Sequence, residues 1–176
     1  MLKAKEGIFE GVAFALAEEM LRASGEMRFE ARGEGMLPEI YPGEELVLHR
    51  TRMHDVCIGD VVLFLEKRQW HLERVREILR GVAQPCVLTR ADSGAERVEP
   101  VFAEELLGRV AFVVRDGDLK VLPRGSSAMH RMMSAAVRHM PVAARGCLAW
   151  HQMRLHLAHL RRGAAELFAG RVSGSA

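Results

Sequence analysis

Cysteine is scarce in this sequence, and its three cysteines, Cys57, Cys86 and Cys147, are far apart along the chain. The number is odd and no Cys-x-x-Cys pair occurs, so the sequence predicts neither a disulfide framework nor a zinc knuckle. We interpret all three residues as reduced, buried thiols, which is typical of proteins in a reducing cytosol.

Long hydrophobic runs are also missing. The longest apolar stretches, such as Val61–Leu65 and Val110–Val114, are far shorter than the roughly 18 residues that a membrane-spanning helix requires. The N-terminal region contains four glutamates between residues 6 and 19, and acidic residues are avoided in export signals. We therefore expect a cytoplasmic protein with neither a signal peptide nor a transmembrane helix.

Aromatic residues make up only 6% of the 176 residues, whereas there are ten methionines. Methionine packs adaptably and replaces part of the bulk that aromatic rings supply, and a methionine-rich surface can also bind partners. With 49% hydrophobic residues, a chain of this length buries a core and forms one domain of ordinary size.

Charge is distributed unevenly along the chain, although the net charge is only +2. Residues 1–123 contain 17 Lys or Arg and 22 Asp or Glu, which gives −5, whereas residues 124–176 contain eight arginines and one glutamate, which gives +7. An acidic body with a basic tail indicates either an anionic partner for the tail or docking of the tail on its own body.

Hydrophobic periodicity divides the chain into a helical N-terminus, a β-rich centre and a helical C-terminus. The spacing predicts a helix over Lys5–Ser24, with an apolar stripe on one side and glutamates on the other. From Met27 to Leu122, short alternating or apolar runs between turn residues predict strands, and Asp116-Gly117 is a hairpin signal between the last two.

We therefore predict an α+β fold in three parts. The parts are an N-terminal helix over residues 1–26, a β domain over residues 27–123, and a basic helical extension over residues 124–176. The β domain is the largest part and contains all the predicted strands, so we expect it to hold the functional site.

The basic extension carries two apolar stripes at helical spacing. The first comprises Met129, Met133, Ala136 and Met140, and the second lies within Trp150–Leu167. We expect the second stripe to pack on the β domain or on a second copy of the chain, with contact to an anionic membrane surface as the alternative.

His151, His156 and His159 cluster in the extension, and the last two lie one helical turn apart, so they could share a metal ion. No acidic or cysteine ligand accompanies them, so we interpret them as part of a basic, solvated face and predict no metal site and no cofactor. The extension contains no recognised nucleic-acid-binding motif, so we expect no nucleic acid partner.

A series of short motifs gives the strongest indication of function. In order they are Gly33-x-Gly35-Met36-x-Pro38, Gly43-Glu44, Gly59-Asp60-Val61-Val62, Arg74-Val75, Asp92 and Gly108-Arg109-Val110. This order resembles the S24/S26 serine peptidases, the group that contains bacterial signal peptidase I and the LexA-type self-cleaving repressors. The resemblance covers about residues 27–122 and implies a β-rich, peptidase-like core.

The resemblance also implies a catalytic dyad. In these peptidases a serine in a Gly-x-Ser-Met-x-Pro loop attacks a peptide carbonyl after a base has removed its proton. The base is a lysine kept neutral by burial or, in some branches, a histidine. Backbone N–H groups near the serine form an oxyanion hole, the methionine packs inward, and the proline stiffens the loop.

Both members of the dyad are replaced in this sequence. Gly35 occupies the serine position, and Glu73 occupies the base position that is counted from Arg74-Val75. Shifting the alignment by two residues brings His71 to the base position but loses the Arg74-Val75 match. Because glycine has no hydroxyl group, the sequence predicts a catalytically inactive relative.

We therefore predict a pseudopeptidase that binds a peptide or protein segment by strand addition in the former active-site cleft. We expect the cleft to be lined by residues of the loop and of one strand: Gly33, Gly35, Met36, Pro38, Glu73 and Arg74. Two alternatives remain open: an active serine-type peptidase with a rearranged catalytic site, and an assembly or membrane-surface module that acts through its helical tail.

Several of these residues also have plainer explanations. Gly35 could be a turn glycine with positive φ in an unrelated protein, and Glu73 could be solvent-facing or salt-bridged. Asp60 and Asp92 lie in predicted turns, so we expect both to stabilise turns through backbone hydrogen bonds. Ser93 could be a displaced nucleophile, but the sequence places no base near it.

Overall fold

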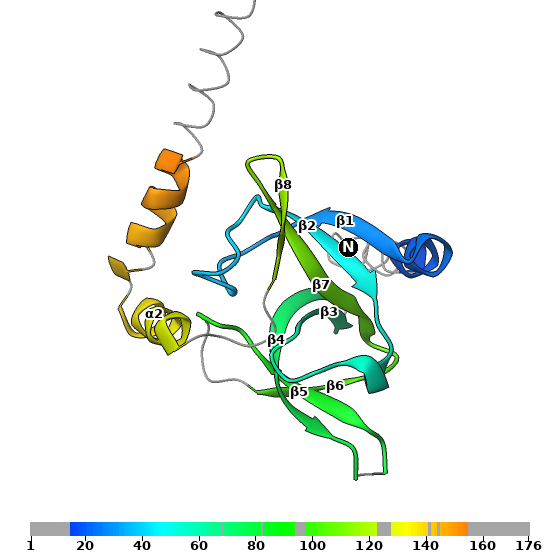
Figure 1. Ribbon diagram of the computed structural model, residues 1–176. Helices are drawn as coiled ribbons and strands as arrows, with labels where there is room; N and C mark the ends of the chain where they lie inside the picture. The colour runs from blue at the N-terminus through cyan, green and yellow to red at the C-terminus, as the bar shows by residue number, and fades with distance from the viewer. Residues whose placement is uncertain are drawn as a thin grey trace, which may run out of the picture.

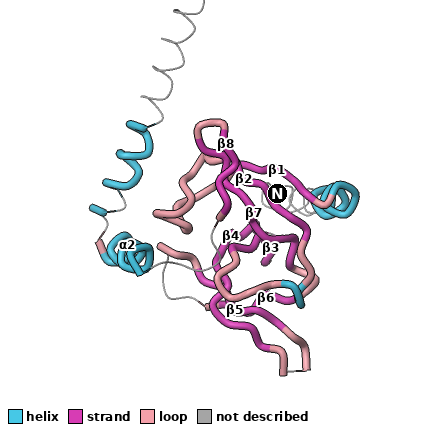
Figure 2. Tube along the Cα trace, in the orientation of Figure 1, coloured by secondary structure: helices cyan, strands magenta, loops and turns pink. Residues whose placement is uncertain are grey.

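The computed structural model of the chain has a mixed α+β fold with one large antiparallel β-sheet and few helices (Figure 1). It describes residues 15–67, 69–81, 83–93, 98–122, 128–140, 142–143 and 145–154. This α+β fold class agrees with the predicted one. Helical segments lie on opposite sides of the strands in Figure 2. No helix in the described ranges is long and apolar enough to cross a membrane.

The sheet contains eight strands, joined by short connections. They are β1 (Glu26–Glu30), β2 (Glu45–Arg50), β3 (Val61–Glu66), β4 (Gln69–Leu79), β5 (Cys86–Arg90), β6 (Glu99–Phe102), β7 (Leu106–Arg115) and β8 (Asp118–Val121). Their hydrogen-bonded order is β1-β2-β7-β3-β4-β5-β6, and β8 pairs with β7.

Helical segments precede, interrupt and follow the sheet. Residues 15–24 form a helix before β1, which is the described part of the helix predicted over Lys5–Ser24. The 3-10 turn η1 (Met53–Asp55) lies between β2 and β3, and the helix α2 (Ala128–His139) follows β8. Residues 145–154 are also helical, while His156 and His159 lie outside the described residues.

Strand β3 lies in the interior of the sheet and is buried on both faces. Val61 and Leu63 belong to one core cluster, whereas Val62 and Phe64 belong to a second. Alternate residues of a strand point to opposite faces, so a strand that is covered on both sides has a continuous apolar run. This explains the uninterrupted Val61–Leu65 stretch and confirms the prediction that short apolar runs in this region form strands.

The first core cluster attaches the N-terminal helix and the Gly33–Gly43 loop to the sheet. Leu21 of the helix and Met36 of the loop are buried with strand residues such as Leu46 and Val110. Burial of a side chain of this size stabilises the fold by about 1.5–3 kcal/mol. The loop is therefore anchored by its own methionine, as the resemblance implied.

Strands β7 and β8 form the predicted hairpin at Asp116-Gly117. Arg115 pairs with Asp118 across the turn, and the two residues between them have φ values of 57° and 90°. Two positive φ values in succession characterise the two-residue type I′ turn, whose twist matches that of the flanking strands.

The C-terminal helices turn a different face toward the β-sheet from the predicted one. Met133 and Met140 of the first stripe are exposed, and Trp150 at the start of the second stripe is 62% exposed, whereas Ser134 and Val137 are buried. The prediction that the second stripe packs on the β domain is therefore wrong for Trp150. The part of that stripe beyond residue 154 lies outside the described residues.

The segment 145–154 contacts the β domain through polar groups instead. His151, which we expected on a solvated face, is buried, and its ring stacks on that of Tyr41 with centroids 4.3 Å apart and planes 1° from parallel. One Nη of Arg154 lies 3.8 Å from a carboxylate oxygen of Glu44. Burial lowers the pKa of His151, and the cations of Arg154 and Arg115 add to this effect while Glu44 opposes it.

Gly108 is required where β7 passes β2 at close range. A Cβ at this position would lie 2.5 Å from the carbonyl oxygen of His49, which belongs to the β2 backbone. At Gly35, by contrast, a Cβ would meet only the Cβ of Ala91, at 3.5 Å. An added methyl group would therefore clash with the β2 backbone at Gly108, whereas it would make an ordinary contact at Gly35.

We predict that Gly108→Ala lowers the free energy of unfolding by about 2 kcal/mol, because the β2 backbone must move to relieve the clash. Gly35→Ala serves as the matched control and should change it by less than about 1 kcal/mol. Equilibrium urea denaturation measures both values. Equal values for the two variants would contradict the close approach of β2 and β7.

Candidate functional site

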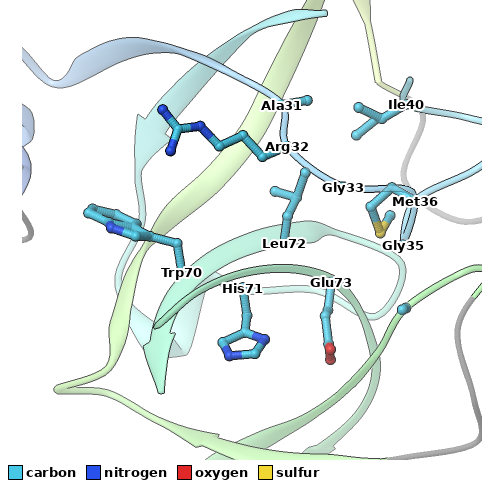
Figure 3. Close-up of a pocket in the computed structure, with 11 residues that line it drawn as sticks. Ala31, Arg32, Gly33, Gly35, Met36, Ile40, Trp70, His71, Leu72 and Glu73 are labelled. Carbon is cyan, nitrogen blue, oxygen red and sulfur yellow. The ribbon is translucent and has the colours of Figure 1, made fainter. Parts of the chain in front are cut away.

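A pocket with a cavity volume of about 190 Å³ lies between the Gly33–Gly43 loop and β4 (Figure 3). Its lining comes from three segments, namely the start of the loop with Ala31, Arg32, Gly33, Gly35, Met36 and Ile40, the β4 residues Trp70, His71, Leu72 and Glu73, and Ala91 after β5. The pocket thus lies where the motif loop meets the strand that contains the predicted base position.

The pocket brings together most of the predicted site residues. Gly33, Gly35 and Met36 line one side, and Glu73 lines the other together with His71, the alternative residue for the base position. Pro38 is buried in the loop and is not among the lining residues. The fold therefore places Gly35 and Glu73 on one cavity, although they are far apart in the sequence.

The backbone of Gly35 does not require glycine. Gly33 has a φ of 76°, a conformation that favours glycine, but the φ of Gly35 is not in that positive range. A side chain at residue 35 would also find room, since its Cβ would make only an ordinary van der Waals contact with Ala91. The explanation of Gly35 as a turn glycine with positive φ is therefore wrong.

Glu73 and His71 extend from the same face of β4, as Figure 3 shows. Glu73 is half-buried, and its carboxylate makes no hydrogen bond or ion pair with any described residue. The ring of His71 stacks on Phe64, with centroids 5.4 Å apart. Of the described residues that line the pocket, none is a serine, threonine, cysteine or lysine, so the lining supplies no nucleophile for acyl transfer.

Ser93 ties the segment after β5 to the loop. Its N–H donates to the carbonyl of Gly35 at 2.9 Å, and its hydroxyl donates to the carbonyl of Glu34. The hydroxyl proton is thus engaged with the loop backbone rather than with a base, which argues for a structural role over that of a displaced nucleophile. Sequence reasoning missed this contact because Ser93 and Glu34 are 59 positions apart.

Arg74 does not lie on the cleft wall, where the sequence predicted it. Its side chain is 1% exposed and is not part of the pocket lining. Its Nε donates to Asp92 at 3.0 Å, one Nη donates to the carbonyl of Gly59 at 2.8 Å, and the other Nη pairs with both Asp92 and Glu39. The guanidinium therefore joins the loop, the turn before β3 and the segment after β5.

The charge of Arg74 is maintained despite its burial. Burial alone disfavours the cation, but the hydrogen bonds and negative charges of Asp92 and Glu39 outweigh that effect and raise the pKa of Arg74. A buried charge requires such compensation, since an unpaired one is very costly in a medium of low polarity. The motif arginine is thus an element of the scaffold.

The two motif aspartates have different roles. Asp60 accepts the N–H of Cys57 at 2.9 Å, which confirms its predicted role in the turn. Asp92 is buried and pairs with Arg74 and, at 2.6 Å, with Arg76, so its interpretation as a turn residue is incomplete. A turn pattern could not reveal a partner on a neighbouring strand.

Glu44 of the Gly43-Glu44 motif fixes the end of the loop. This buried carboxylate accepts the N–H of Tyr41 at 3.0 Å and the Nε of Arg115 at 2.7 Å. Arg115 also donates to the carbonyl of Glu39. Arg74 therefore holds the loop through the carboxylate of Glu39, and Arg115 holds it through the backbone carbonyl of the same residue.

Comparison with known proteins gives no further assignment, since neither a protein-family model nor a curated protein matches this sequence. The resemblance to S24/S26 peptidases rests on the ordered motifs alone. Within the part of the chain that the structure describes, no group of His, Cys, Asp and Glu residues is placed to hold a metal ion.

We predict that Arg74→Met lowers the free energy of unfolding by about 3–5 kcal/mol, because it leaves the buried Asp92 and Glu39 carboxylates without their cation. Arg28→Met is the matched control. It removes an ion pair with Glu45 in which both side chains are exposed, and such a pair contributes less than about 1 kcal/mol. Urea denaturation of both variants measures the difference, and similar losses would contradict the structural role of Arg74.

Proposed function

We propose that the chain is a catalytically inactive relative of the S24/S26 peptidases, with an S24/S26-like core over residues 27–123, and that it binds a peptide or protein segment. One observation carries the proposal. The motif loop and β4 enclose a single pocket at the two dyad positions, Gly35 and Glu73, but the described lining offers no hydroxyl, thiol or amine. The pocket has room for a ligand, but its described lining has no group that could attack a peptide carbonyl.

The pairing of β4 favours an extended peptide as the ligand. Residues Gln69–Glu73 of β4 pair with β3 on one side. On the other side β5 begins to pair only at Arg74, opposite Arg90, so no described strand pairs with His71–Glu73 along this edge. Free N–H and C=O groups along a strand edge are a template for strand addition, in which main-chain hydrogen bonds hold the peptide.

The loop opposite this edge is fixed before any ligand arrives. Met36 anchors it in the core, Ser93 binds its backbone, and Arg74 pairs with Glu39 near its end. Because little of the loop has to become ordered on binding, the entropic cost of forming the complex is reduced. These contacts support binding and do not depend on the missing dyad.

We predict that the unchanged chain cleaves no member of a diverse peptide library at a defined site, as read by mass spectrometry. Loss of the nucleophile of a serine peptidase typically costs a factor of about 10⁶ in rate. Gly35→Ser with Glu73→Lys should gain cleavage over Gly35→Ala with Glu73→Lys, which lacks only the hydroxyl. Defined products from the unchanged chain would instead establish an active peptidase with a rearranged site.

Binding itself can be followed through Trp70, which lines the pocket. The chain has two tryptophans, so Trp150→Phe leaves Trp70 as the only one. We expect a saturable change in its emission when pooled, capped heptapeptides are added to this variant. A pool that leaves the emission unchanged at every concentration would count against the peptide-binding proposal.

A second candidate function, an assembly or membrane-surface module, is favoured by the outward face of the C-terminal helices. Its exposed apolar side chains are Met132, Met133, Met140, Val142, Trp150 and Met153. Residues 124–154 contain five arginines and no acidic residue. An apolar face with cationic surroundings can associate with an anionic membrane or with the acidic body of a second copy.

We predict for this candidate that Met132→Ser, Met133→Ser and Trp150→Ser together abolish the association that the unchanged chain shows. Sedimentation with phosphatidylserine vesicles measures membrane binding, and light scattering measures self-association. Leu119→Ser with Val121→Ser, which removes exposed apolar groups from β8, is the control and should change neither. An unchanged chain that is monomeric and does not sediment with vesicles rules this candidate out.

A further inference from the structure

We infer that the pocket takes a cationic side chain of the bound segment, whose ammonium or guanidinium group pairs with the carboxylate of Glu73. This inference rests on the proposed function, since it assumes that a peptide or protein segment occupies the pocket. It adds the chemical class of the side chain that the segment presents and the residue that selects it.

Glu73 differs from the other buried or half-buried carboxylates around the loop in that its carboxylate has no partner among the described residues. Glu39 and Asp92 pair with Arg74, and Glu44 pairs with Arg115. Glu73 is half-buried and lines the pocket, yet no described residue donates a hydrogen bond to it or forms an ion pair with it. A carboxylate that is partly removed from water gains most from a cation, because its lost hydration is otherwise not replaced.

The space beside Glu73 suits a long aliphatic stem with a charged tip. Gly35 contributes no side chain, and a Cβ there would contact only Ala91, so the cavity extends to the loop backbone. Met36 and Leu72 add apolar surface on the loop side of β4, while the Glu73 side chain extends from the opposite face of this strand (Figure 3). Lysine and arginine bury their methylene groups along such a surface while their charged ends remain in polar surroundings.

Arg32 does not satisfy Glu73 from within the pocket. Figure 3 shows its guanidinium at the Trp70 end of the pocket, away from the Glu73 carboxylate. Arg32 is exposed to solvent, where dissolved salt screens its charge. The remaining polar side chain of the lining, His71, stacks on Phe64. The Glu73 end of the pocket is therefore the end that attracts a cation.

The test uses three pools of acetylated, amidated heptapeptides, randomised except for a central lysine, norleucine or glutamate. Norleucine has nearly the length of lysine without its charge. Each pool is passed over the immobilised full chain, the retained peptides are quantified by mass spectrometry, and affinities are then measured by Trp70 emission in the Trp150→Phe background. We expect the lysine pool to bind about tenfold more tightly than the norleucine pool, the effect of one charge-assisted hydrogen bond.

Substitutions in β4 assign the preference to one carboxylate. Glu73→Gln should abolish the difference between lysine and norleucine, and Glu73→Lys should transfer the preference to the glutamate pool. Glu77→Gln removes the same charge from an exposed position of the same strand, outside the pocket lining, and should keep the lysine preference. Thermal unfolding of each variant establishes that it is folded.

The outcomes separate this inference from the proposed function. Equal retention of the lysine and norleucine pools by the unchanged chain overturns the cationic preference and leaves peptide binding in place. A lysine preference that survives Glu73→Gln overturns the assignment to Glu73. If the unchanged chain retains none of the pools, both the inference and the proposed function fail.

Discussion

The buried guanidinium of Arg74 is the interaction on which the pocket depends. It is surrounded by a loop residue, Glu39, by the carbonyl of Gly59 before β3, and by Asp92 after β5. Removing a cation from water is so costly that only a conformation with all these partners in place is favourable. Three segments that are far apart in the sequence are thereby held in one arrangement, and the cavity between loop and β4 is its result.

The side-chain positions at residues 35 and 73 are distinct from the groups that hold the loop, although Met36 both packs in the core and lines the cavity. Met36 packs in the core, Ser93 binds the loop backbone, and Arg74 pairs with Glu39. Gly35 contributes only its backbone carbonyl to these contacts, and the carboxylate of Glu73 contributes to none of them. A chain built in this way can exchange the side chains at residues 35 and 73 with little effect on the contacts that hold the loop.

Local patterns in the sequence were sufficient for the strands other than β6 and for the Asp116-Gly117 hairpin, because alternation and turn chemistry act over a few residues. They were insufficient for Arg74, whose partners lie 18 and 35 positions away. They also misjudged the C-terminal helices, where we expected an apolar face inward. The rings of His151 and Tyr41 make that contact. A contact between polar rings produces no hydrophobic periodicity in the sequence, so the apolar pattern could not predict it.

The stack between His151 and Tyr41 connects the helical segment 145–154 to the loop that lines the pocket. Tyr41 directly follows Ile40, a residue of the pocket lining, and its N–H is held by Glu44. A displacement of residues 145–154 withdraws the ring that covers Tyr41 and so loosens the loop from its far end. If a ligand of the pocket shifted Tyr41, it would change the free energy of the helix contact by the same amount as that contact changes the free energy of ligand binding, because such couplings are reciprocal.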